Sequence, residues 1–179
     1  YLKIDKDSSL KTILKKAPIK IVRELKKFKL LKRNGIIEYP KLGFEELEII
    51  VKKIKKFDGG LLLIDYGFVK QENINTLQSI KSHKKNRIFD NIGNADITSL
   101  VNFSLLKDYL SKNELTLNKV VSQSFFLKRV GILNRAEILG NKMSFREKTD
   151  LYFRLKRLLD PKYMGDLFKV IFAYKSKKK

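Results

Sequence analysis

The stretch that decides the fold is Gly59-Gly60-Leu61-Leu62-Leu63-Ile64-Asp65-Tyr66-Gly67. Its apolar run is too short for a helix, and it ends in an acid, an aromatic residue and a glycine. Runs of this kind are typical of central strands in parallel sheets, which are covered on both faces. Because ligands of α/β sheets bind at the carboxyl ends of strands, Asp65, Tyr66 and Gly67 are candidate site residues.

The sequence before this strand predicts a hairpin and helices. Residues 1–15 alternate around a polar cluster, a pattern typical of a β-hairpin. Pro18 suits the first turn of a helix that reaches Leu30 or Leu31, and a short strand is expected at 36–39. Over 43–57, apolar residues at helical spacing face away from a row of lysines, which predicts an amphipathic helix.

The sequence after this strand alternates between helical and extended patterns. Residues 68–96 are polar and without periodicity, so a long loop is expected. A helix capped by Asn102 is expected next, followed by a strand at 120–121 and a helix over 124–139 that is broken near Gly131 and has Phe125 to Leu127 in the core. A further helix should begin at the capping box of Ser144 and Glu147 and end at Pro161. A turn at Gly165 should lead into a last strand at 167–174.

Composition limits the classes of function. The chain has no Cys and one His, His83, so a disulfide framework, a thiolate zinc site and a multi-histidine metal site are not expected. No apolar run is long enough to span a membrane. The net charge of +21 attracts nucleic acids and anionic surfaces. Only 8 of the 40 basic residues are Arg, which favours a solvated lysine surface over a nucleic-acid interface.

Four blocks of sequence together resemble the MidA family. In chain order they are Leu62–Gly67 with Asn75–Gln78 and His83; Asp90, Gly93, Ala95–Thr98 and Val101–Phe103; Gln123, Phe126–Leu127, Gly131–Ile132 and Arg135–Ala136; and Leu159–Pro161, Met164–Gly165 and Leu167–Val170. The blocks cover 59–174, and their shared order is more specific than any one of them.

The resemblance implies a class I methyltransferase fold, S-adenosyl-L-methionine as methyl donor, and protein arginine methylation linked to assembly of respiratory complex I. The expected fold class is α/β, the C-terminal half of a Rossmann-like class I methyltransferase sheet with extra helices. Residues 1–58 would form a hairpin and helical segment on the substrate side, 59–174 the C-terminal half of the methyltransferase domain, and 175–179 a disordered basic tail. The family's glycine-rich cofactor loop would lie upstream of Tyr1, so this piece alone is expected to be inactive.

Methyl transfer from a sulfonium depends on positioning and needs no metal, and an arginine substrate is best held by carboxylates. Three groups of candidate residues follow. They are Asp65, Tyr66 and His83 for catalysis; Asp65 and Gly67 for the cofactor; and Glu38, Thr76, Gln78, Asp96 and Gln123 for the substrate.

Each candidate also has a structural interpretation. Asp65 can be a turn or cap acid, Tyr66 can pack, and Gly67 can serve backbone geometry. His83 can be a surface residue, Thr76 and Gln78 solvated loop residues, and Asp96 part of a local turn with Thr98.

Three functions are therefore compared: a methyltransferase acting on a protein substrate such as a complex I subunit, a basic RNA- or DNA-binding module, and a non-catalytic assembly factor that kept the fold. The protein is expected in the cytoplasm if it is bacterial and in the mitochondrial matrix if it is eukaryotic. The oligomeric state stays open.

Overall fold

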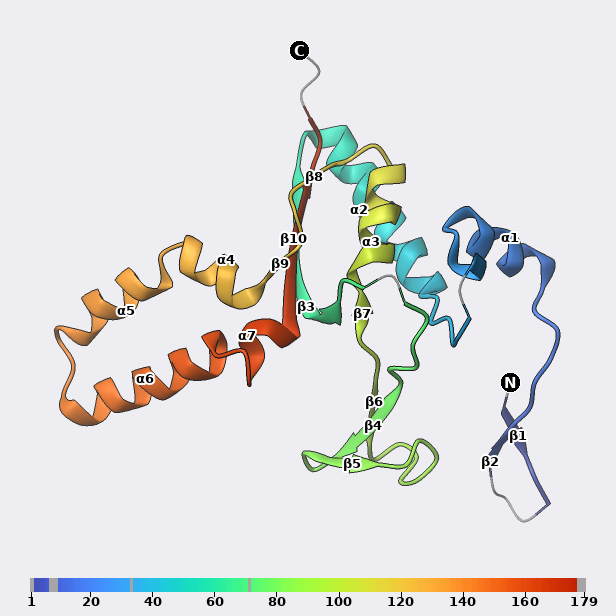
Figure 1. Ribbon diagram of the computed structural model, residues 1–179, viewed down its shortest axis with the longest axis horizontal. Helices are drawn as coiled ribbons and strands as arrows, with labels where there is room; N and C mark the ends of the chain where they lie inside the picture. Colours follow the sequence, from blue (N-terminus) through green and yellow to red (C-terminus); the bar gives the residue numbers. More distant parts are fainter. Residues whose placement is uncertain (1, 7–9, 33, 71, 177–179) are drawn as a thin grey trace. The chain divides into compact units, whose positions relative to one another are not determined.

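The computed structural model describes residues 2–6, 10–32, 34–70 and 72–176 (Figure 1). Helices and strands are mixed along these residues, which confirms the α/β class. The chain divides into two compact units: unit 1 comprises Tyr1–Tyr39 and Glu72–Ser99, and unit 2 comprises Pro40–Gln71 and Leu100–Lys179. Among the described residues, no helix combines the length and the apolar character needed to cross a bilayer.

The sheet of unit 2 is built around β3 (Gly60–Phe68) and β10 (Phe168–Tyr174). These strands pair antiparallel from Phe168 opposite Tyr66 to Tyr174 opposite Gly60. The order across the sheet is β7-β3-β10-β8, and β9 also pairs with β10. β7 (Val101–Asn102) runs parallel to β3, whereas β8 (Thr116–Leu117) and β9 (Val121–Ser122) run antiparallel to β10. The predicted inner strand and closing strand are both confirmed.

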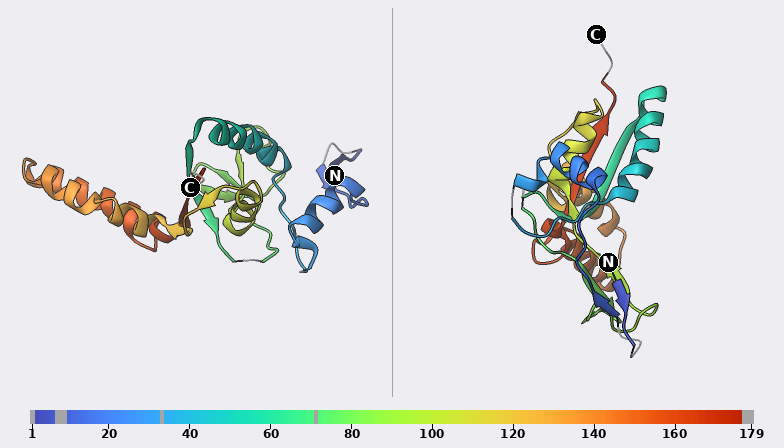
Figure 2. Two further views of the ribbon diagram at one scale, coloured as in Figure 1. Left: turned by 90° about the horizontal axis from the view of Figure 1, so that it is seen from above. Right: turned by 90° about the vertical axis from the view of Figure 1, so that its right-hand side faces the viewer.

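One face of β3 is only partly covered. One helix comes directly before β3 and another directly after β7. Figures 1 and 2 show these two helices side by side on one face of the sheet. On the other face, Leu62 is 45% exposed and Ile64 is 43% exposed. The expectation of a strand covered on both faces is therefore wrong for the described residues. An apolar run shows that a strand is inside a sheet, but it does not show which segment covers each face.

The first of these helices, α2 (Lys41–Phe57), confirms the predicted amphipathic helix. Its buried side chains are Phe44, Leu47, Val51 and Ile54. The second, α3 (Phe103–Lys112), begins after Asn102, whose side chain accepts a hydrogen bond from the Leu105 N–H at 3.0 Å, as a predicted N-cap should.

Tyr109 joins α3 to α2. Its ring stacks on Phe44 with centroids 4.2 Å apart, and its hydroxyl donates to the Phe44 carbonyl at 2.9 Å. Partial burial, and secondly the negative charge of Glu48, raise the pKa of Tyr109. The phenol therefore stays neutral and keeps its proton for this hydrogen bond.

Residues 123–167, called the arm, extend from the opposite face of the sheet (Figures 1 and 2). The arm contains α4 (Gln123–Arg129), α5 (Ile132–Gly140), α6 (Phe145–Leu159) and α7 (Met164–Leu167). The break near Gly131 is confirmed, with φ +89° at that glycine. Two expectations are wrong: Phe125 is 52% exposed rather than in the core, and Gly165 lies inside α7 rather than in a turn. α4 packs on α6 and α7, and the sequence does not show which of its positions face them.

The predicted capping box starts α6. The Ser144 hydroxyl accepts a hydrogen bond from the Glu147 N–H at 3.4 Å, and the Glu147 carboxylate accepts one from the Ser144 N–H at 2.8 Å. Hydrogen bonds from the Ser144 side chain and then its backbone lower the pKa of Glu147. The carboxylate is thus part of the helix start.

Replacing Ser144 with alanine is expected to destabilise the chain by about 1 kcal/mol at neutral pH, since the cap is lost. Because the pKa of Glu147 is lowered in the folded state, its contribution is present above the unfolded pKa and is lost as the pH falls through the folded pKa. The difference in the free energy of unfolding between wild type and Ser144→Ala should therefore become smaller at acid pH. Urea unfolding followed by circular dichroism at neutral and acid pH measures it, and a difference that widens in acid contradicts the prediction.

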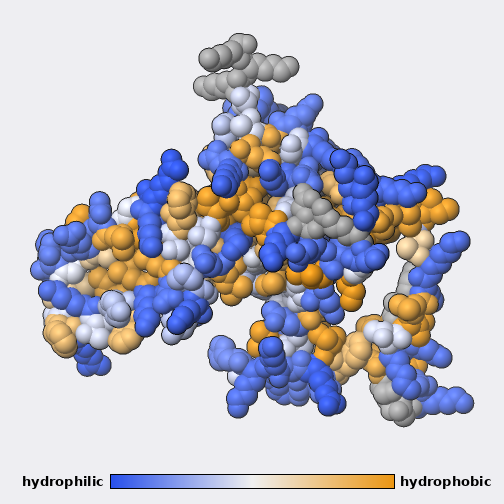
Figure 3. Space-filling view, in the orientation of Figure 1, coloured by the Kyte–Doolittle hydropathy of each residue, from blue (hydrophilic) through white to orange (hydrophobic). Residues whose placement is uncertain are grey.

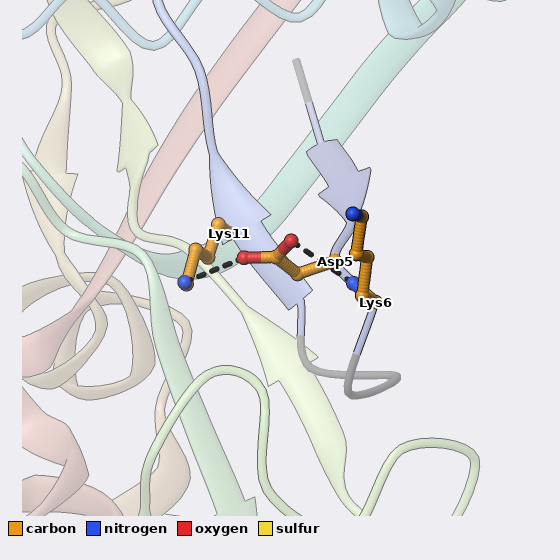
Figure 4. Close-up of polar contacts among 3 residues, drawn as sticks. All are labelled: Asp5, Lys6 and Lys11. Atoms are coloured by element: carbon orange, nitrogen blue, oxygen red, sulfur yellow. Dashed lines mark hydrogen bonds and ion pairs between the residues drawn. The ribbon is translucent and has the colours of Figure 1, made fainter.

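Unit 1 begins with the predicted hairpin, formed by β1 (Leu2–Ile4) and β2 (Leu10–Thr12). Figure 4 shows how Asp5 ties it together: one carboxylate oxygen contacts the Lys11 ammonium at 2.6 Å and the other accepts from the Lys6 N–H at 2.9 Å. These contacts, Lys11 first, lower the pKa of Asp5. The next helix, α1 (Ile19–Lys27), is shorter than predicted because Lys29 has φ +58°, and a 3-10 turn, η1 (Leu30–Lys32), follows.

A three-stranded antiparallel sheet replaces the long loop expected over 68–96. It consists of β4 (Gln78–Lys81), β5 (Lys84–Asn86) and β6 (Asp96–Thr98), with β4 in the middle. These strands are short and polar, so no hydrophobic pattern marks them. The expectation of a strand at 36–39 is also wrong. Among the described residues near it, the backbone forms an isolated bridge between Gly35 and Asn73 and no strand.

A disordered tail is expected over 175–179, but its first residue, Lys175, makes defined contacts. The Lys175 ammonium pairs with Asp58 at 2.7 Å, and its N–H bonds to the Gly59 carbonyl at 3.3 Å. Residues 177–179, the rest of that expected tail, lie outside the described residues.

Candidate functional site

The candidate residues of β3 lie near the carboxyl end of the strand. Asp65 is exposed, and one oxygen accepts a hydrogen bond from the Tyr66 N–H at 2.8 Å. Lys169 stands opposite Asp65 in the pairing with β10. The Tyr66 ring makes an edge contact with Phe168, with centroids 5.7 Å apart. Asp65 thus presents an accessible carboxylate, while Tyr66 is partly committed to packing.

Gly67 is held in a close backbone contact. It pairs with Val101 where β3 and β7 run parallel. A Cβ on Gly67 would lie 2.2 Å from the Val101 carbonyl oxygen and 2.9 Å from the Phe103 ring. The space that a side chain would need is therefore filled by protein, and glycine is required here for packing.

Glu38 and Thr76, two substrate candidates separated by 38 residues, are brought together in unit 1. One Glu38 oxygen accepts from the N–H groups of Thr76 and Leu77 at 2.8 and 2.9 Å, and the other accepts from the Thr76 hydroxyl. A carboxylate offers about four acceptor positions, so three are already used. We call this group the Glu38 latch, and it holds the chain before α2 against the segment before β4.

The other candidates of unit 1 lie on its small sheet. Gln78 begins β4 opposite Thr98, and Asp96 begins β6 opposite Ile80. The Asp96 side chain is exposed and forms no hydrogen bond or ion pair with any described residue. It is the least committed acid among the substrate candidates.

His83 lies in the turn between β4 and β5. Ser82 and His83 have φ of +49° and +62°, as in a two-residue hairpin turn, and the imidazole is exposed. The neighbours along the chain are Lys81, Lys84 and Lys85. His83 belongs to unit 1, whereas Asp65 and Tyr66 belong to unit 2.

Gln123 is buried at the start of α4, where its side-chain nitrogen donates to the Leu158 carbonyl of α6 at 3.0 Å. This contact ties α4 to α6, the longest helix of the arm. Substrate contact by Gln123, like the roles of the other candidates, stays a prediction.

Asn86 is a residue that the sequence does not single out. Its side-chain nitrogen donates to the Ser79 hydroxyl and to the carbonyls of Arg87 and Asp90, and its oxygen accepts from Asn91. The network fixes the loop after β5. Asparagine is common in polar loops, so only the contacts reveal it.

The described residues contain no group of three or more His, Cys, Asp and Glu side chains placed to hold a metal ion. What the residues offer instead is a set of separate carboxylates: Asp65 and Asp96 are accessible, and Glu38 is largely used by the latch. Such groups can accept hydrogen bonds from cationic or hydroxyl-bearing ligands.

A family match covers most of the chain. Residues 1–121 match the family described as "Putative S-adenosyl-L-methionine-dependent methyltransferase". The chain belongs to this methyltransferase family. The resemblance to MidA proteins seen in the sequence is thereby confirmed, and S-adenosyl-L-methionine is the cofactor of the family.

Curated relatives carry a more specific name. "Protein arginine methyltransferase NDUFAF7, mitochondrial" of Danio rerio is 28% identical over 127 residues, which is 69% of this chain and 30% of that protein. The Caenorhabditis elegans protein named as its homolog is 30% identical over 118 residues, 66% of this chain and 26% of that protein. The chain therefore spans less than a third of these relatives.

Two solved structures from Burkholderia thailandensis share the fold. An uncharacterized protein matches 97% of this chain and 48% of its own, with a TM-score of 0.74 and 20% identity. A "likely methyl transferase" bound to S-adenosyl-homocysteine matches 97% of this chain and 46% of its own, with a TM-score of 0.68 and 20% identity. The fold is accordingly that of about half of a Rossmann-like class I methyltransferase.

Proposed function

We propose that the protein carrying this chain is an S-adenosyl-L-methionine-dependent methyltransferase that acts on arginine side chains of a protein substrate. The family match over residues 1–121 is the observation that carries the proposal. The name of the Danio rerio relative supports arginine as the target. The MidA resemblance supports a substrate in respiratory complex I. It also supports a location of the protein in the mitochondrial matrix if the protein is eukaryotic, and in the cytoplasm if it is bacterial.

The chain's own residues would position the two reactants. S-adenosyl-L-methionine supplies an electrophilic methyl group on its sulfonium. Asp65, exposed near the end of β3, fits a role as acceptor for a cofactor or substrate N–H or O–H. Gly67 fits a cofactor contact less well, because its side-chain space is filled by Val101 and Phe103.

An arginine substrate calls for carboxylates that hold the guanidinium and take up the proton that the attacking nitrogen releases. No described residue donates a hydrogen bond to the Asp96 carboxylate, which leaves its acceptor positions to such a group. Glu38 would have to release part of the latch with Thr76 first. Among the carboxylates of unit 1 we therefore rank Asp96 above Glu38 as a substrate contact, and Asp65 of unit 2 is a separate candidate. His83 of unit 1 is a candidate proton acceptor.

Titration of the full-length protein with S-adenosyl-homocysteine by calorimetry tests the proposal. We expect one binding site, weakened roughly 10- to 100-fold by Asp65→Asn, since a hydrogen bond to a charged group is lost. Asp150→Asn on α6, also exposed, is the matched control and should leave the affinity unchanged.

The same experiment separates the alternatives. A full-length protein that binds neither S-adenosyl-homocysteine nor the methyl donor is a non-catalytic assembly factor. If the protein binds nucleic acid tightly and with a steep salt dependence, but binds neither S-adenosyl compound, it is the basic nucleic-acid-binding module. Mass spectrometry of methylated substrate then identifies the residue, and methylated lysine would overturn the arginine assignment.

A further inference from the structure

The α6 helix of the arm has an apolar side that no described residue covers. Phe145 is 87% exposed, and Tyr152 and Phe153 are each 60% exposed. Their spacing of seven and eight residues places them on one side of the helix. A separate row of half-buried leucines, at 151, 155, 158 and 159, forms the packed side. The aromatic side is thus additional to the side that stabilises the arm.

A second helix of the arm also exposes apolar side chains. Leu133 and Ile138 of α5 are 50% and 61% exposed. In Figure 3 the arm shows a hydrophobic band bordered by hydrophilic residues. Exposed apolar surface with a polar border is characteristic of interaction sites.

The border of this band is positively charged. The arm contains ten basic and five acidic residues. On α6, Arg146, Arg154 and Arg157 are exposed and follow each other at helical spacing beside the aromatic side. Within the described part of the chain, no basic residue of the arm forms an ion pair.

Two of the nearby acids are already engaged. Glu147 is held in the capping box of α6, and the Asp160 side chain accepts a hydrogen bond from the Lys162 N–H. The guanidinium and ammonium groups of the arm are therefore available to an anion from outside the arm. Their positive charge selects the kind of surface that can cover the band.

We propose that the arm docks on an anionic lipid surface through the aromatic side of α6. Aromatic side chains enter the boundary between headgroups and acyl chains, while flanking Arg and Lys contact lipid phosphates, as in interfacial amphipathic helices. A second copy of this chain is a poorer occupant, because it would bring like charges together. Nucleic acid would satisfy the cations but would leave the phenyl and aliphatic side chains in water.

Sedimentation of the full chain with lipid vesicles tests the proposal. The chain should sediment with vesicles of phosphatidylcholine and phosphatidylglycerol in equal parts and stay in solution with pure phosphatidylcholine vesicles. Binding should weaken steeply with salt, because screening shortens the reach of the charges.

Two independent variants locate the binding surface. Arg154→Glu with Lys156→Glu should weaken partitioning at least about 30-fold, since each basic residue contributes about 1 kcal/mol near an anionic surface. Phe145→Ser with Phe153→Ser should weaken it roughly tenfold or more through the loss of inserted apolar surface. Circular dichroism confirms that each variant keeps its helices.

Matched controls lie on α2. Lys53→Glu with Lys56→Glu changes the net charge equally, and Leu42→Ser with Phe57→Ser removes side chains that are 75% and 70% exposed. Both controls should bind vesicles nearly as the wild type does. Equal loss in the charge control would show a general effect of net charge and overturn the proposal.

Other outcomes are also decisive. Equal binding to neutral vesicles, or binding to neither kind, overturns the proposal. Arm-dependent binding to an RNA or DNA duplex without vesicle binding assigns the arm to nucleic acid instead. Arm-dependent dimerisation without vesicle binding assigns it to a second copy. None of these outcomes depends on cofactor binding, so the result is separate from the methyltransferase proposal.

Discussion

Replacing Phe103 with alanine should destabilise the full chain by about 3–5 kcal/mol, because a large side chain is deleted where the surroundings cannot collapse. Phe103 is fully buried at the start of α3, and its ring lies 2.9 Å from the place that a Cβ on Gly67 would take. The helix start itself survives, since Asn102 supplies the cap. The loss is a large part of the 5–15 kcal/mol that keeps a typical domain folded.

Urea unfolding monitored by circular dichroism measures this loss. Phe125→Ala is the matched control, because Phe125 also follows the end of a short strand but is 52% exposed. It should change the free energy of unfolding by less than about 1 kcal/mol. Similar losses in the two variants would show that α3 is not anchored on the sheet through Phe103.

These two phenylalanines show what the sequence reveals about the core. Both stand near the start of a helix that follows a short strand. Periodicity locates a helix and its apolar positions, but it does not show which neighbour packs on them. Three predictions that the structure confirms have local causes: the period of α2, the Asn102 cap, and the capping box of Ser144 and Glu147.

The elements that sequence reasoning missed have non-local causes. β4, β5 and β6 are polar strands that exist because three segments pair with each other. The partial exposure of Leu62 and Ile64 depends on both helices lying on one face of the sheet. No pattern within any one segment encodes such facts.

The candidate site shows the same division. The strand ending in Asp65, Tyr66 and Gly67 follows from a local pattern, and the structure places it in the sheet as expected. The contact of Glu38 with Thr76 spans 38 residues, so the sequence offers both residues but not their pairing. The resemblance to a family singles out Gly67 as a candidate residue. The structure shows why glycine is needed there, because Val101 and Phe103 fill the space of a side chain.

Replacing Gly67 with alanine is expected to destabilise the chain by about 3 kcal/mol or more through overpacking. The added Cβ would lie 2.2 Å from the Val101 carbonyl oxygen, a backbone atom that cannot move without separating β7 from β3. Gly140→Ala is the control, since no atom of the described residues lies within 4 Å of a Cβ there. It should be neutral or slightly stabilising, because alanine favours the helix.

A double mutant separates the two contacts of Gly67. In Gly67→Ala with Phe103→Ala, the ring contact is removed while the clash with the Val101 oxygen stays. The combined loss should therefore fall short of the sum of the single losses by roughly 0.5–3 kcal/mol, yet exceed that of Phe103→Ala alone. Strict additivity would mean that the ring and the new methyl group never meet.

The same glycine variant distinguishes packing from cofactor contact. If Gly67 acts through packing, the full-length Gly67→Ala protein loses S-adenosyl-homocysteine affinity only as it loses stability, and conditions that restore folding restore binding. A variant with wild-type unfolding behaviour and weakened binding would instead place Gly67 against the ligand. The parallel contact between β3 and β7, at Gly67 and Val101, would then have to be looser than the structure shows.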